Sequence, residues 1–158
     1  MKQVNAAKGR LGFRMEQSEK QLLLQVLALY PLIPTDHQTL SKTGQSEEDQ
    51  KLLEEALAAH RQENRKQLEL MLKSKSRFRQ TSGRQTCLFS LKISEAEWLL
   101  QVLNDIRVGS WLRLGSPERT EEFFAALSEQ TAPYFWAMEV SGHFQMVLVH
   151  AMRRQSSG

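Results

Sequence analysis

The sequence lacks a second cysteine, a glycine-rich loop and a long apolar run, and each absence excludes a class of protein. Cys87 is the single cysteine, so the chain cannot form an internal disulfide, and a reducing, cytoplasmic location is expected. The eight glycines are scattered, so no glycine cluster opens a helix to bind phosphate. Polar and charged residues interrupt the most apolar stretch, residues 134–152. Because a membrane span needs about 20 mainly apolar residues, we expect no membrane segment.

Signatures of catalysis and of metal binding are also absent from the sequence. The four histidines include no His-Glu-x-x-His box. Glu139, His143 and His150 share one helix face, but without such a box they are better explained as structural or surface residues. No serine lies in a nucleophile elbow, and no catalytic motif surrounds Cys87. The sequence therefore predicts a protein that is not an enzyme and that holds no cofactor or metal.

Length and composition indicate one domain, but the charge is unevenly distributed. A chain of 158 residues with 41% apolar and 25% charged residues is typical of a single globular domain. Residues 1–14 and 73–86 carry nine basic and no acidic residues, which leaves 12 basic residues (21 − 9) against all 18 acidic ones. Both basic segments lead into candidate strands, so this asymmetry bears on partners more than the net charge does.

An internal repeat is the strongest pattern in the chain. Residues 13–27 align without a gap to residues 89–103, at an offset of 76 residues (94 − 18), with eight identities in fifteen positions. The identities include a phenylalanine, a Ser-Glu pair and the run Leu-Leu-Gln-Val-Leu. This agreement favours a duplication over a chance similarity between two amphipathic helices. We place the two repeats at about residues 10–75 and 86–152 of a single domain, residues 1–158.

Each repeat is expected to begin with a strand that leads into a helix. Every second residue of 11–15 and of 89–93 is apolar, and this period of two predicts a strand with one buried face. The two strands are expected to pair as a two-stranded ribbon, most simply antiparallel, because each would be unstable alone. Ser18 and Ser94 then stand where helix N-caps are expected, and Glu97 would complete a capping box with Ser94.

The remaining sequence predicts helices, so the fold is expected to be mainly α, a bundle of five or six helices with a small ribbon. Ser46 is followed by three acidic residues, which favour the N-terminus of a long helix. Ser116 and Pro117 start a later helix in the expected cap and N1 positions. The last helix, from about residue 133, is apolar nearly all round, which is typical of a helix in the centre of a bundle.

Two polar residues fall on the apolar side of the long second helix. His60 and Asn64 share the stripe that carries Leu57 and Leu68. Polar groups on such a face are normally hydrogen-bonded, so we predict that His60 and Asn64 form a bonded pair under partial cover. A binding site at these two residues is the alternative interpretation.

A second polar group lies in the middle of the third predicted helix, among apolar neighbours: Asn104, Asp105 and Arg107. Arg107 can lie across Trp111, four residues further on, as a cation–π contact. The candidate partners of Asp105 are Arg61 and Arg65. Because an unpaired buried charge is costly, we expect Asp105 and Arg107 to be covered and paired. Exposure of both in a groove would instead indicate a partner surface.

Residues 98–99, 103–107 and 113–115 together resemble the signature of an uncharacterised bacterial family, DUF2017. Its members share a Trp-Leu, a Leu-Asn-Asp-hydrophobic-Arg and an Arg-Leu-Gly pattern, and an early Glu-x-x-x-Leu-Leu helix that residues 19–24 match. The resemblance is firm over about residues 89–115. The family has no established activity, so it implies no site residues. Its genes often lie beside the adaptor that delivers substrates to Clp proteases, which implies a link to regulated proteolysis.

The sequence leaves two functional hypotheses. The first is a non-enzymatic interaction or regulatory module that binds another protein through a surface of the bundle, because no catalytic chemistry is present. The second is nucleic-acid binding, because a duplicated strand-helix-helix unit resembles a ribbon-helix-helix dimer fused into one chain, whose ribbon enters a major groove. The candidate nucleic-acid contacts are Arg10, Arg14, Lys75, Arg77, Arg79 and Lys92. The acidic remainder of the chain favours the first hypothesis.

Overall fold

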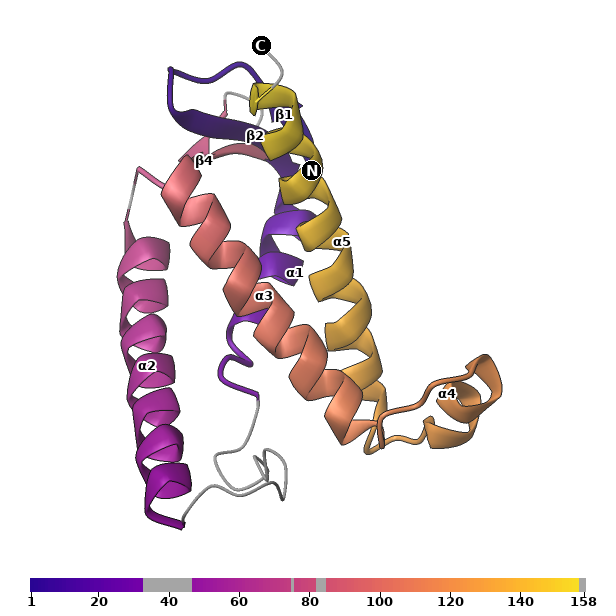
Figure 1. The fold of residues 1–158 in the computed structure, drawn as a ribbon. Coiled ribbons are helices and arrows are strands. Elements are labelled where there is room, and N and C mark those ends of the chain that lie inside the picture. The colour runs from indigo at the N-terminus through magenta and orange to yellow at the C-terminus, as the bar shows by residue number, and fades with distance from the viewer. Residues whose placement is uncertain (33–46, 75, 82–84, 157–158) are drawn as a thin grey trace.

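The protein consists of long helices that lead away from a small sheet at one end of the molecule (Figure 1). The computed structural model describes residues 1–32, 47–74, 76–81 and 85–156. The described residues form nine elements: β1 (Lys2–Val4), β2 (Arg10–Glu16), α1 (Gln17–Leu27), α2 (Glu47–Lys73), β3 (Phe78–Gln80), β4 (Thr86–Lys92), α3 (Ile93–Arg113), α4 (Thr120–Ala126) and α5 (Ala132–Ser156). α3 runs between α2 and α5, and α4 lies at the end far from the sheet (Figure 1). The predicted mainly α fold is confirmed.

The predicted ribbon is the centre of the sheet. β2 pairs antiparallel with β4, with Phe13 opposite Phe89, so the predicted antiparallel direction is confirmed. Phe13 and Phe89 occupy equivalent positions of the repeat, at the offset of 76 residues (89 − 13). The pairing therefore has a pseudo-two-fold axis through these two phenylalanines, as expected when a duplicated strand pairs with its own copy.

The prediction of two strands is wrong, because β1 and β3 extend the ribbon on both sides. The sheet has the order β1-β2-β4-β3, and both added strands are antiparallel to their neighbours. They start at Lys2 and Phe78, again 76 residues apart (78 − 2). A strand of three residues is too short to show an alternating pattern. β1 and β3 form because the outer edges of β2 and β4 offer unpaired backbone groups.

The predicted N-caps at Ser18 and Ser94 are wrong, and so is the capping box with Glu97. Each helix follows its strand directly, so both serines lie at the second position of their helices. The glutamate after each serine caps the helix instead, by accepting a hydrogen bond from the backbone N–H of the N-cap residue. These bonds join Glu16 N to Glu19 Oε2 (2.9 Å) and Lys92 N to Glu95 Oε2 (2.7 Å). The two repeats thus use the same cap.

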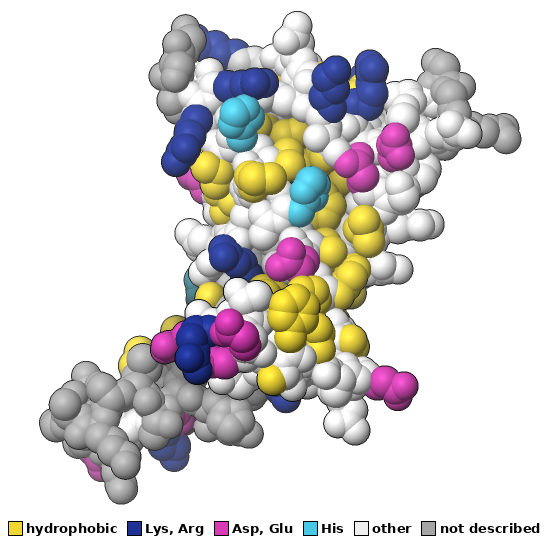
Figure 2. All heavy atoms as spheres, turned by 90° about the vertical axis from the view of Figure 1, so that its right-hand side faces the viewer, with side chains coloured by type: hydrophobic (Ala, Val, Ile, Leu, Met, Phe, Trp, Pro, Cys, Tyr) yellow, Lys and Arg dark blue, Asp and Glu magenta, His cyan; other side chains and the backbone are white. Residues whose placement is uncertain are grey.

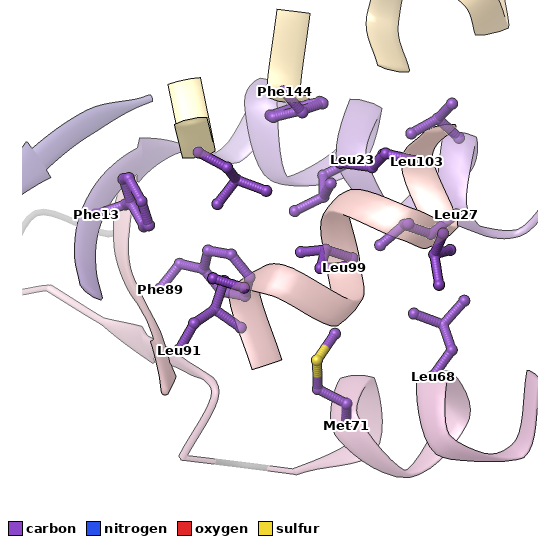
Figure 3. Packing of buried hydrophobic residues seen from close by; sticks show 14 of the residues in the cluster. Phe13, Leu23, Leu27, Leu68, Met71, Phe89, Leu91, Leu99, Leu103 and Phe144 are labelled. Carbon is purple, nitrogen blue, oxygen red and sulfur yellow. The ribbon is translucent and has the colours of Figure 1, made fainter. Parts of the chain in front are cut away.

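The core lies between the inner face of the sheet and the helices that leave it. Figure 3 shows Phe13 and Phe89 on the central strands, with Leu99 of α3 and Phe144 of α5 among the side chains packed beside them. Apolar side chains from the sheet, α1, α3 and α5 form one buried cluster, to which α2 contributes Leu68 and Met71. Most of the chain's apolar burial therefore occurs where the two repeats meet.

The prediction that the last helix is central is wrong. The buried residues of α5 recur at spacings of three and four, so they form one face: Ala137, Ser141, Phe144, Leu148 and Ala151. The opposite side of α5 is mixed, because Met146, which is 65% exposed, lies there among the exposed Glu139, His143 and His150. Of the described elements, α3 and the short α4 lie beside this side, and α4 has no buried residue of its own. This side of α5, with Met146 as its exposed large apolar residue, is therefore open to solvent.

We predict that Glu95→Ala lowers the free energy of unfolding by about 3 kcal/mol, because it removes a helix cap and leaves Arg77 without its carboxylate. Both Glu95 oxygens bond the Arg77 guanidinium, at 2.7 and 2.8 Å, and the Arg77 side chain is only 11% exposed. Ser94→Ala should change this free energy by less than about 0.5 kcal/mol. Chemical denaturation of both variants measures the two effects, and equal losses would contradict the assignment of the cap.

Glu95 should also make the fold sensitive to acid. The Arg77 guanidinium holds the pKa of Glu95 below its usual 4.5, at about 2. A carboxyl group with a lowered pKa stabilises the fold above the pKa of the unfolded chain, and this stability is lost as the pH falls toward the folded pKa. We expect the free energy of unfolding to drop between about pH 4.5 and pH 2, and to drop less in Glu95→Gln. Urea denaturation across this range checks the slope. Parallel curves for the two proteins would exclude a contribution from Glu95.

Candidate functional site

The open side of α5 forms a groove with α3 and α4. The groove has a volume of about 970 Å³. Its apolar lining comes from three helices: Val108 and Trp111 of α3, Phe123 of α4, and Met138 and Met146 of α5. Figure 2 shows this face, where hydrophobic side chains form a band that is interrupted by histidine and charged side chains. We call this groove the α3–α5 groove.

The α3–α5 groove is open because of the small residue at its floor. A Cβ atom added to Gly142 would meet nothing within 4 Å. A second hollow of about 400 Å³ continues along α5 and shares Arg107, Gly142 and Met146 with the first. This continuation reaches Val149 and Arg153. The two hollows form one path along the outer side of α5, from Met138 to the last turns of the helix.

The polar side chains of the groove are mostly basic or histidine. Arg107, His143 and His150 are exposed at its margin, with Glu139 as the acidic residue among the lining side chains. Arg107 makes no ion pair with any described residue. The prediction that Arg107 is covered and paired is therefore wrong, because its position on α3 faces the gap beside α5.

The predicted contact of Arg107 with Trp111 is also absent from the described aromatic contacts. Trp111 Nε1 instead donates a hydrogen bond to the Pro117 carbonyl, at 3.1 Å. The cation–π contact of this region joins Arg113 to Tyr134 of α5, with the guanidinium carbon 5.9 Å from the ring centroid. Both contacts hold the end of α3 against the segments that follow it. The Arg107 side chain takes part in neither of them and remains available at the groove.

A second, more polar groove lies on the other side of α3, against α2. It has a volume of about 550 Å³ and is lined by His60, Arg61, Asn64, Asn104 and Asp105, among others. The structure thus brings four of the predicted polar residues together, and it separates three of them, His60, Asn64 and Asp105, from Arg107. Asn104 lines both grooves, because it lies on the exposed edge of α3 between its two neighbours.

Asn64 is the structural centre of this second groove. It is buried, its Nδ2 donates to the Tyr30 hydroxyl (3.2 Å), and its Oδ1 accepts from Trp98 Nε1 (3.0 Å). The predicted hydrogen-bonded pair of His60 with Asn64 is therefore wrong, since His60 is exposed. Asn64 instead joins α2 to the end of α1 and to α3 through these two hydrogen bonds. A buried amide holds helices together in this way when it finds hydrogen-bond partners.

Asp105 is half-buried in the same groove, beside the buried Arg61. Burial raises the pKa of the Asp105 carboxyl, and the charges of Arg61 and His60 oppose this shift. The two side chains therefore interact at a distance, without an ion pair within 4 Å. The other candidate partner, Arg65, instead donates to the Tyr30 carbonyl and lies 3.4 Å from Glu69.

The basic residues predicted to contact nucleic acid differ in where the structure places them. Arg10, Arg14, Arg79 and Lys92 lie on the outer face of the sheet, as their register opposite one another shows. Arg77 forms an ion pair with Glu95 and is therefore not available to phosphate. Lys75 lies outside the described residues. The predicted entry of a two-stranded ribbon into a major groove does not fit. Four strands span about 14 Å between outer backbones, more than the roughly 12 Å width of that groove.

Metal ligands, membrane-spanning helices and the cysteine are further candidate features of the described part of the chain. No group of three or more His, Cys, Asp or Glu side chains there could hold a metal ion. No helix there combines the length and apolarity that a membrane crossing requires. Cys87 is buried on the inner face of the sheet, and burial raises the pKa of its thiol.

Comparison with family models, with curated proteins and with solved structures gave no match.

The groove residues Val108, Met138 and Met146 were not identified by the sequence analysis. All three are apolar residues outside the buried faces of their helices, and this is the signal that the sequence carried. Periodicity could not show which apolar residues stay open, because that depends on how many neighbours surround each helix.

We predict that Asn64→Ala lowers the free energy of unfolding by about 2–3 kcal/mol, because it leaves the Tyr30 hydroxyl and the Trp98 indole N–H without their partner. Arg107→Ala should change it by less than about 0.5 kcal/mol, since Arg107 is exposed. Thermal and urea denaturation of both variants checks the contrast. A large loss of stability in Arg107→Ala would show that Arg107 belongs to a structural network after all.

Proposed function

We propose that the protein is a non-enzymatic interaction module that binds an amphipathic helix of a partner protein in the α3–α5 groove. The observation that carries this proposal is the α3–α5 groove, which no described element covers and in which Met146 is 65% exposed. Its apolar lining comes from three helices: Val108, Trp111, Phe123, Met138 and Met146. Contiguous exposed apolar surface on a small protein typically marks an interaction site. The absence of catalytic motifs in the sequence agrees with a binding role rather than with chemistry.

The shape of the groove supports a helix as the occupant. The path from Met138 to Arg153 covers sixteen residues of α5, and the fifteen rises between them (153 − 138) amount to about 22 Å of helix. A partner helix of about four turns would match that length, with side chains at spacings of three and four reaching the lining. The two methionines can adapt to the shape of such side chains, because their thioether chains are flexible and polarisable.

The charged side chains at the margin of the α3–α5 groove indicate which charges the partner helix should carry. Arg107, His143 and His150 lie beside the apolar path, and Glu139 lies among them. A partner helix with acidic residues flanking its apolar face would place carboxylates near Arg107 and the histidines. Such rim charges mainly steer association and set orientation, while the apolar anchors supply most of the affinity.

A photo-crosslinking residue at position 146 tests the proposal and identifies the partner. The matched position is Leu70 of α2, which is 72% exposed but lies far from the groove. We expect one defined partner protein to be crosslinked at position 146, and we expect that protein not to be crosslinked at position 70. The resemblance to DUF2017 makes the substrate-delivery adaptor of Clp proteases the first purified protein to test. The same crosslinked set at both positions would contradict the proposal.

We predict that Val108→Glu weakens binding of that partner by about tenfold or more, because it places a charge on the apolar lining. Leu70→Glu is the control, since it adds the same charge to an exposed leucine outside the groove, and should change the affinity by less than about twofold. Isothermal titration with the purified partner measures both affinities. Equal effects of the two substitutions would place the binding surface elsewhere.

A further inference from the structure

We propose that the outer face of the sheet is a second binding surface, which contacts the phosphate backbone of a nucleic-acid duplex. The surface is distinct from the α3–α5 groove and does not depend on the function proposed for it. It is defined by Lys2, Arg10, Arg14, Arg79 and Lys92, which the sheet brings together from all four strands. We call these residues the basic face.

The strand register places the basic face opposite the core. Phe13, Phe89 and their alternate neighbours point inward and are buried, so the residues between them point outward. Lys2 lies opposite Arg14, Arg14 opposite Leu88, and Leu88 opposite Arg79. This register forms one row across the four strands that carries three exposed basic side chains.

A second pair of basic residues lies further along the same face. Arg10 is opposite Lys92, and Arg10 Nε donates to Ser90 Oγ at 3.0 Å, which holds the guanidinium over the sheet. A hollow of about 410 Å³ opens between Arg10, Arg79 and Ser90. Gln155 of α5 donates to the Arg10 carbonyl at 2.6 Å, so the end of α5 lies beside the start of β2. Figure 2 shows Lys and Arg side chains at this end of the molecule.

The fold itself does not require these charges. Under the pseudo-two-fold relation of the repeats, the position of Arg10 corresponds to Thr86, that of Arg14 to Ser90, and that of Lys92 to Glu16. The equivalent positions of the same sheet therefore carry neutral or acidic residues. The inner phenylalanines, by contrast, are the same in both repeats. Packing of the sheet thus does not require a basic residue at Arg10, Arg14 or Lys92.

The chemistry of the face favours a duplex backbone as the ligand. Three of its five basic residues are arginines, whose planar guanidinium groups match phosphate oxygens. The aromatic residues of the described strands, Phe13, Phe78 and Phe89, lie on the inner side, so unpaired bases would find no stacking platform. Leu88 is half-buried, so the described strands offer no large exposed apolar side chain for insertion into a bilayer. Backbone contacts of this kind carry no sequence preference.

The test uses fluorescence anisotropy with two 20-base-pair duplexes of unrelated sequence. The first variant combines Arg10→Thr, Arg14→Ser and Lys92→Glu, so each residue becomes the one at its equivalent position in the other repeat. The control combines Lys66→Thr, Lys73→Ser and Lys51→Glu on the exposed surface of α2, which changes the net charge by the same amount. Circular dichroism verifies the fold of both variants. If the first variant is unfolded, Arg14→Ser alone replaces it, because Arg14 is exposed.

We expect both duplexes to bind the wild type with similar affinity, and binding to weaken as salt rises. The slope should be about −0.9 log units per log unit of salt for each phosphate contact. The first variant should lower the affinity by about tenfold or more and flatten the slope by about two to three units, or by about one for Arg14→Ser alone. The α2 control should change neither, and Val108→Glu should leave duplex binding unaffected.

Three results would overturn the proposal. One is the absence of duplex binding at about 50 mM salt with protein in the tens of micromolar range. At that salt this concentration lies well above the dissociation constant expected for a basic surface of this kind. Another is an equal loss of affinity in the basic-face variant and in the α2 control, which would indicate a response to net charge alone. The third is tighter binding to single strands or to phosphatidylserine vesicles than to duplex.

Discussion

The antiparallel pairing of β2 with β4 is the interaction on which the rest of the structure depends. β1 and β3 exist as strands because they add to the outer edges of this pair, and α1 and α3 begin where its two strands end. The inner side of the pair carries Phe13 and Phe89, against which the helices pack. A slip of one residue between the two strands would leave one of the two phenylalanines on the outer face, so the core and the strand register specify each other.

The two halves of the molecule agree where they meet and differ where they face solvent. The paired phenylalanines and the glutamate caps at Glu19 and Glu95 are shared. The long helices that close the halves are different, because α2 is largely polar and exposed whereas α5 buries one face in the core and lines the α3–α5 groove with Met138 and Met146. The outer strand positions differ as well. Both proposed binding surfaces therefore lie where the halves diverge, at positions that can change without loss of the core.

The polar group of α3 shows how far a candidate site can be inferred from sequence. The sequence pattern indicated a segment whose residues Asn104, Asp105 and Arg107 each line a groove. The pattern predicted one structural role for the whole group, whereas Asp105 faces α2 and Arg107 faces α5. Successive positions of a helix point about 100° apart, so residues close in sequence can serve two surfaces. Which neighbour each side chain meets depends on helices that are remote in sequence.

The sequence by itself determined the central strands, the helices that follow them and their antiparallel relation, because alternation and repetition are local properties of the chain. It also placed Cys87 among the strand residues of the core. The tertiary structure alone decided the added strands β1 and β3, the partners of Asn64, the exposure of Arg107 and the open side of α5. Hydrophobic periodicity reports which side chains gain free energy from burial. It does not report whether enough neighbouring surface exists to bury them, and on α5 that surface is missing among the described residues.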